Sequence, residues 1–90
     1  MTQDGLPEVD RAVRGVLADV LGLTPDRVAA FDEATALFGA IPELDSMAVA
    51  GLLTELEDRL VIRIDDDEVD GEMLETFGGL RAFAARKALV

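Results

Sequence analysis

The stretch IPELDSMAVAGLLTELEDRL, residues 41–60, closes a loop and then opens a helix. Its apolar residues recur at offsets of 0, 3, 4, 7 and 11, a single stripe at the α-helical period. They are Val49, Leu52, Leu53, Leu56 and Leu60. Asp45 precedes the stripe as a candidate N-cap, and its negative charge suits the positive end of the helix dipole. The pattern predicts a helix over residues 46–60 that buries one face.

Two further segments carry an apolar stripe at the same period, which predicts helices over residues 7–21 and 76–87. Gly22 is placed to end the first of them, and Thr76 is placed to cap the second. Two glycines at positions 78 and 79 weaken the first turn of the last helix, by roughly 1 kcal/mol each relative to alanine.

The segment over residues 23–44, between the first two helices, breaks this pattern. Thr24 and Pro25 suit the start of one short helical turn. A loop of this length is uncommon in so small a domain unless it is functional or packs apolar residues of its own. We expect the second case, with Leu37 and Phe38 held in the core.

An acidic run over residues 65–70 follows a short extended link at residues 61–64 and predicts a short helix or turn that ends at Gly71. Four residues occupy the opening positions of a calcium-binding loop: Asp66, Glu68, Asp70 and Gly71. Phe77 then stands where an EF-hand requires a bidentate Glu, so too few ligands remain for tight binding. We therefore expect a solvated acidic turn and no metal site.

The length and composition of the chain limit the folds that it can adopt. The chain has 90 residues, of which 50% are apolar, enough for one compact core and too many for a disordered acidic tail. The helical segments predict an all-α fold, a small four-helix bundle with three longer helices and one short helix. We expect a single domain over residues 1–90, with flexible ends at about 1–5 and 88–90.

The net charge of −11, from 8 basic and 19 acidic residues, narrows the function. Nucleic acid phosphates and anionic lipid headgroups are bound through Lys and Arg, so neither is an expected partner. The chain has no Cys and no His, so the usual nucleophile–base pairs cannot be built and an enzyme is not expected. We see no signal peptide and no apolar run near the roughly 20 residues of a membrane span, so we expect a cytoplasmic protein. A monomer is the starting expectation for its oligomeric state.

Ser46 follows Asp45 at the predicted start of the second long helix, where backbone N–H groups lack helical partners and a phosphate group is stabilised. At 100° per residue, Ser46 lies about 60° from the centre of the apolar stripe and Met47 lies near 160°, facing solvent. An Asp-Ser pair is also an ordinary helix cap, and a serine can also be a kinase substrate. The combination with an acidic chain that lacks catalytic groups favours a covalent attachment site.

In these features the chain resembles the acyl carrier proteins. The resemblance rests on the Asp-Ser-Met motif at residues 45–47, on the segment at 52–68 and on the Thr-Phe-Gly-Gly-Leu sequence at 76–80. It covers nearly the whole chain, from residue 8 to residue 87. It implies a small helical bundle that acts as a carrier and has no catalysis of its own.

The resemblance implies that Ser46 accepts 4′-phosphopantetheine from coenzyme A, in a reaction run by a separate Mg²⁺-dependent phosphopantetheinyl transferase. The thiol of this arm holds acyl groups as thioesters and presents them to enzymes of a fatty-acid, polyketide or specialised lipid pathway. Because the carrier is acidic, enzymes that load and transfer the acyl group are expected to have basic patches. Six residues are expected to contact such partners: Leu44, Asp45, Met47, Ala48, Glu55 and Asp58.

Three positions depart from the pattern common in carriers of fatty acid synthesis. Ala48 and Gly51 stand where acidic residues are usual, and Leu44 stands where Gly is usual. The exposed face of the second long helix is therefore expected to begin small and apolar, which fits a specialised pathway better. Residues 41–47 and 65–72 are similar to stand-alone carriers encoded with bacterial exosortase and exopolysaccharide systems.

Two alternatives to an acyl carrier stay open. An aminoacyl or peptidyl carrier would use Ser46 in the same way, although the net charge of −11 favours acyl cargo. A non-covalent interaction module would dock its acidic surface on a basic partner and would not need the Ser46 hydroxyl.

Overall fold

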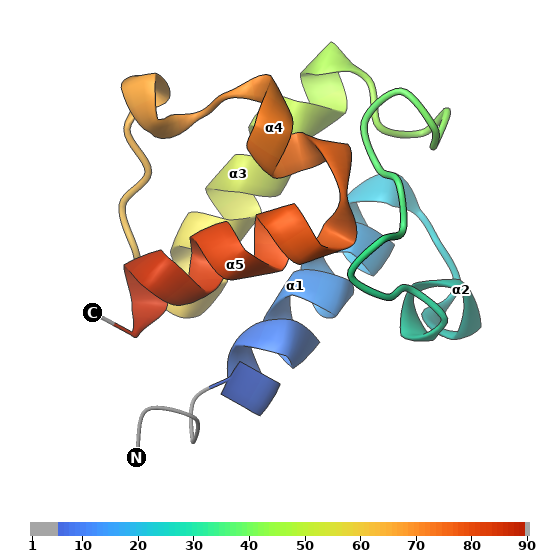
Figure 1. The fold of residues 1–90 in the computed structure, drawn as a ribbon, viewed down its shortest axis with the longest axis horizontal. Helices are drawn as coiled ribbons and strands as arrows, with labels where there is room; N and C mark the ends of the chain where they lie inside the picture. Colours follow the sequence, from blue (N-terminus) through green and yellow to red (C-terminus); the bar gives the residue numbers. More distant parts are fainter. Residues whose placement is uncertain (1–5, 90) are drawn as a thin grey trace.

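The computed structural model describes residues 6–89, and the chain there is helical throughout its regular structure (Figure 1). The elements are α1 (Leu6–Leu21), α2 (Pro25–Ala29), α3 (Ser46–Leu60), the 3₁₀ turn η2 (Asp66–Glu68), α4 (Gly71–Glu75) and α5 (Phe77–Ala88). The all-α fold and its three longer helices are confirmed. The predicted flexible ends fall partly outside the described residues, at 1–5 and 90. No helix within residues 6–89 has both the length and the hydropathy that a membrane span requires.

The short elements differ from the single short helix that we expected. Thr24 caps α2, with its hydroxyl accepting from the Arg27 amide at 3.2 Å, as its position predicted. The acidic run forms η2, and Gly71 begins α4 instead of ending a turn. The reason is Asp70, whose carboxylate accepts from the Met73 amide at 3.0 Å and caps a new helix.

Helix α1 is the centre of the bundle, because it contacts α2, α3 and α5. Figure 1 shows α5 crossing the front of α1 and α3, with α4 above it. The apolar stripes predicted from the sequence meet in one core. Its largest fully buried side chains are Phe77, Leu17, Leu37, Leu52, Leu56, Leu80, Val13 and Val16.

The long loop is attached to the end of α4 by backbone hydrogen bonds. The Leu37 amide donates to the Glu75 carbonyl at 2.8 Å, and the Phe38 amide donates to the Leu74 carbonyl at 2.9 Å. Leu37 is fully buried, as predicted, but Phe38 is 47% exposed, so the prediction that it is held in the core is wrong. Phe38 begins the turn over residues 38–40, directly after Leu37, and this turn leaves the Phe38 ring half exposed while the Leu37 side chain is buried.

The predicted cap of α5 is confirmed, because the Thr76 hydroxyl accepts from the Gly79 amide at 3.0 Å. The glycine at position 78 has a packing reason. Its amide donates to the Glu33 carbonyl at 3.1 Å, and a Cβ at this position would lie only 2.8 Å from that oxygen. Close approach of the loop to α5 thus requires Gly78, at the cost of helix propensity.

Val61 ends α3 in the left-handed conformation, with φ 53° and ψ 53°. Its side chain is 90% exposed, so little packing compensates for the strain that a β-branched residue has there. We expect Val61→Gly to raise the free energy of unfolding by about 1 kcal/mol in urea titration. Val61→Ala keeps the Cβ and should recover less than half of that gain. If Val61→Gly lowered the free energy of unfolding instead, the conclusion that the Val61 backbone is strained would be wrong.

Candidate functional site

Helix α3 begins at Ser46, as the sequence predicted. The Asp45 carboxylate accepts from the Ala48 amide at 2.8 Å, and the Asp45 carbonyl accepts from the Val49 amide at 3.0 Å. Asp45 itself has extended backbone angles, so it forms the N-cap of this helix. Ser46 is therefore the first helical residue, and its side chain is exposed.

The Ser46 hydroxyl differs from the other hydroxyl groups of the described chain. Ser46 is the single serine of the sequence. Each threonine within residues 6–89 takes part in a local hydrogen bond; these are Thr24, Thr35, Thr54 and Thr76. The Ser46 hydroxyl has no hydrogen bond to any residue that the structure describes. It is thus an exposed, unengaged hydroxyl at the positive end of a helix.

A groove leads away from Ser46 along α3. One part, of 460 Å³, lies between α3 and the segment that follows it, and its apolar lining includes Val49, Leu53, Ile64 and Val69. At 1.5 Å per residue, the α3 wall from Ser46 to Glu57 is about 16 Å long. The groove offers an apolar surface that starts at the exposed hydroxyl.

A second hollow of 310 Å³ adjoins the first and shares Ser46, Val49 and Val69 with it. Its remaining lining comes from Asp70, which caps α4, from Gly71 and Leu74 of α4, and from Phe38, which we expected in the core. Phe38 belongs to the site because the turn that begins there leaves its ring half exposed. The sequence carried no signal for this, since the direction depends on the pairing of the loop with α4.

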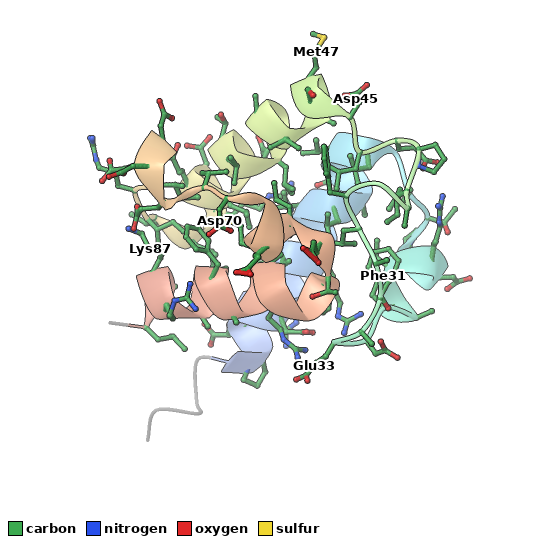
Figure 2. All side chains as sticks on the ribbon, turned by 45° about the horizontal axis from the view of Figure 1, so that its top comes forward. Phe31, Glu33, Asp45, Met47, Asp70 and Lys87 are labelled. Carbon is green, nitrogen blue, oxygen red and sulfur yellow. The ribbon has the colours of Figure 1, made fainter. Side chains whose placement is uncertain are left out.

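Met47 is 85% exposed, as the helical wheel predicted. Figure 2 shows its side chain projecting away from the body of the protein at the head of α3, beside Asp45. Leu44 differs from the expectation of a partner contact, because it is only 3% exposed. It precedes the N-cap, a position whose apolar side chain typically packs back against the fourth helical residue, here Val49. We therefore correct its assignment from contact surface to core.

The small residues of α3 also lie differently from the prediction. Ala48 and Gly51 are partly buried, and a Cβ on Gly51 would lie 3.6 Å from the Val20 side chain of α1. Gly51 therefore lies in the contact between α3 and α1, and Ala48 packs against the core, so neither forms an exposed face. Small side chains here allow close packing of α3 on α1.

The acidic residues predicted to contact partners lie farther along α3. Asp58 is exposed. Glu55 pairs with Arg59 at 3.3 Å, and Arg59 also binds Asp19 of α1. The free negative charge of this face is therefore concentrated at Asp58, with Glu55 partly neutralised.

The acidic run has structural uses of its own. Glu68 accepts from the Asp65 amide at 2.9 Å and from Lys87, and these bonds hold the pKa of its carboxyl below the usual value. Asp70 caps α4. Within residues 6–89, no three acidic side chains are grouped so that they could hold a metal ion.

A small helical bundle, one unengaged serine hydroxyl and an apolar groove beside it are together compatible with a carrier domain. Comparison with solved structures finds the holo acyl carrier protein of Nitrosomonas europaea, determined by solution NMR, with 41% sequence identity and a TM-score of 0.77. The match covers 87% of this chain and 92% of that one. The chain therefore belongs to the acyl carrier protein family, whose members are carriers and not enzymes. No protein-family model and no curated protein matches the chain.

Proposed function

We propose that the chain is one carrier domain in which Ser46 bears a covalent 4′-phosphopantetheine arm. The observation that carries the proposal is the exposed and unengaged hydroxyl of the single serine, held by the Asp45 cap at the start of α3. The similar protein from Nitrosomonas europaea is a holo acyl carrier protein, which supports an arm in this chain also.

The chemistry is a transfer of phosphopantetheine from coenzyme A to serine. The Ser46 oxygen attacks the phosphorus next to the pantetheine, the bond to the adenosine bisphosphate breaks, and the hydroxyl proton leaves to a base of the transferase. The carrier would supply the hydroxyl and its position, and the N-terminus of α3 would stabilise the anionic phosphodiester formed at Ser46. A separate Mg²⁺-dependent phosphopantetheinyl transferase supplies the catalysis.

We propose acyl groups, held as thioesters on the arm, as the cargo. The groove begins at the attachment point and is lined by Val49, Leu53 and Val69, so an apolar chain tethered at Ser46 can leave water by entering it. An aminoacyl or peptidyl cargo would gain less from such a lining. Loading of amino acids in preference to acyl groups would favour the alternative carrier.

Partner enzymes are proposed to approach the head of α3. Met47 supplies an exposed apolar contact, and Asp45 and Asp58 supply charge for basic patches on the transferase and on acyl-loading and acyl-transferring enzymes. We propose that the protein is a monomer in the cytoplasm, the compartment in which coenzyme A is available. A specialised lipid pathway fits better than fatty acid synthesis, because the usual acids are absent at Ala48 and Gly51.

The roles of Asp45 can be separated by two variants. Asp45→Ala removes the cap and should cost about 1 kcal/mol of stability, whereas Asp45→Asn keeps a capping oxygen and should cost little. Both remove the charge, so both should slow phosphopantetheine transfer about tenfold, the loss of one charged contact. Urea titration and a transfer assay measure the two effects. If Asp45→Asn transfers at the unaltered rate, Asp45 acts as a cap alone.

The proposal is tested by incubating the purified chain with coenzyme A and a promiscuous phosphopantetheinyl transferase. Intact mass should increase by one phosphopantetheine unit. A chain that gains no mass, while its Ser46→Ala variant works normally in cells, would instead be the non-covalent interaction module.

A further inference from the structure

The wall of the groove that faces α3 is the segment over residues 61–70, which Figure 1 shows climbing from the end of α3 toward α4. Its lower end is fixed by the Ile64 amide, which donates to the Glu57 carboxylate at 2.8 Å. Its upper end is fixed where Asp70 caps α4. Ile64 and Val69 face the groove between these points and are only partly buried.

Between these two ends, a single polar contact joins the wall to another element of the described chain. Lys87, in the last turn of α5, places its Nζ 2.8 Å from both carboxylate oxygens of Glu68. The other hydrogen bonds of residues 65–69 stay within the segment, such as the Asp65 amide donating to Glu68. We call the Glu68–Lys87 pair the clasp. Figure 2 shows Lys87 at the end of α5.

Two features stabilise the Glu68–Lys87 ion pair. The side chains of Lys87 and Glu68 are 26% and 32% exposed, so water screens the pair less than it screens a free surface pair. Glu68 is fixed by its bond to the Asp65 amide, so the carboxylate is in place before Lys87 binds it. The ammonium group also offsets repulsion among the neighbouring acids of the run.

We propose that the Glu68–Lys87 clasp sets the width of the groove beside Ser46 and thereby limits the size of the acyl chain that it accepts. The inference rests on the proposed carrier function. A short wall with two half-buried apolar residues has few contacts to keep it closed, so it belongs to the less stable parts of the fold. With the clasp intact, the wall stays against α3 and admits slender chains. Without it, the wall moves outward and admits longer or branched ones.

The test uses holo protein with Lys87→Met, which removes the charge, keeps an apolar stem and leaves the Asp65–Glu68 bond in place. Arg86→Met is the matched control: Arg86 lies in the same turn, and its guanidinium lies 5.9 Å from the Phe83 ring centre, with no ion pair in the described chain. Lys87→Arg keeps a positive charge at this position and should retain the ion pair with Glu68. Amide hydrogen exchange across residues 65–69 should rise about fivefold in Lys87→Met, and it should stay unchanged in the other two variants.

Each protein is then loaded with acyl chains of increasing length and branching, and the rise in melting temperature on loading is recorded. The chain that gives the largest rise should be longer or bulkier for Lys87→Met than for the unaltered protein. Equal exchange and equal chain preference in these two proteins would overturn the inference while leaving the arm intact. Failure of the transferase to add an arm to any of them, seen by intact mass, would overturn the proposed function and the inference with it.

Discussion

Ser46→Ala is expected to reduce phosphopantetheine transfer to background, because it removes the attacking oxygen. No other serine is available, and the described threonines are held in local hydrogen bonds. Transfer is followed with a fluorescent coenzyme A analogue and a promiscuous transferase. The unaltered protein should be labelled at a one-to-one ratio, and the variant should show no label.

Stability distinguishes this loss from unfolding. The Ser46 hydroxyl bonds to no described residue and is exposed, so Ser46→Ala should change the free energy of unfolding by less than about 0.5 kcal/mol. Thr54→Ala is a matched control on the same helix: it removes a hydroxyl that bonds to the Ala50 carbonyl and should keep full labelling. Labelling of Ser46→Ala at the unaltered level would contradict the assignment.

Phe77→Ala is expected to give the largest loss of stability, about 3–5 kcal/mol. Phe77 is fully buried, and its ring centre lies 5.9 Å from that of Phe31. Two guanidinium groups lie over the same ring, Arg14 at 4.5 Å and Arg81 at 5.3 Å. The substitution therefore leaves a cavity and removes the ring that both guanidinium groups contact.

For a domain of this size the whole free energy of unfolding is about 5–13 kcal/mol, so Phe77→Ala removes a large part of it. The urea midpoint should fall steeply with little change in slope. Phe38→Ala makes the same chemical change at a half-exposed ring and should cost about 1 kcal/mol or less. Similar losses in the two variants would contradict the core that the structure describes.

The long helices could be predicted because their pattern is local. The apolar stripe from Val49 to Leu60 specifies the buried face of α3, and Asp45 and Thr76 cap their helices through side chains only three residues away. Burial follows from such repeats whenever one face of a helix is apolar. The site shares this origin, because Ser46 and Met47 owe their exposure to their place in the same repeat.

The remainder of the site depends on contacts between distant residues. The sequence did not reveal that Phe38 turns outward, because the pairing of its loop with Leu74 and Glu75 decides the direction. The sequence predicts only that Gly78 weakens the helix, because the close approach of Glu33, which requires a glycine there, involves a residue far away along the chain. Leu44 was placed at the contact surface by likeness to other carriers, although its burial depends on the turn before α3.

The ion pair between Lys87 and Glu68 is another contact that the sequence did not reveal, because 19 residues separate the two along the chain. No periodic pattern links the last turn of α5 to a 3₁₀ turn in an acidic run. Short polar segments have little apolar periodicity, so their position is set by single contacts such as this one. The groove, one wall of which includes Asp66 of this 3₁₀ turn, was therefore not predicted.

The central claim is that Ser46 bears the arm, and the most direct measurement is mass spectrometry of the unaltered chain after reaction with coenzyme A and a phosphopantetheinyl transferase. Intact mass should show complete conversion to a species heavier by one phosphopantetheine unit. Peptide fragmentation should place that unit on Ser46. An unchanged mass under conditions that load another acyl carrier protein, or a unit on a different residue, would contradict the account.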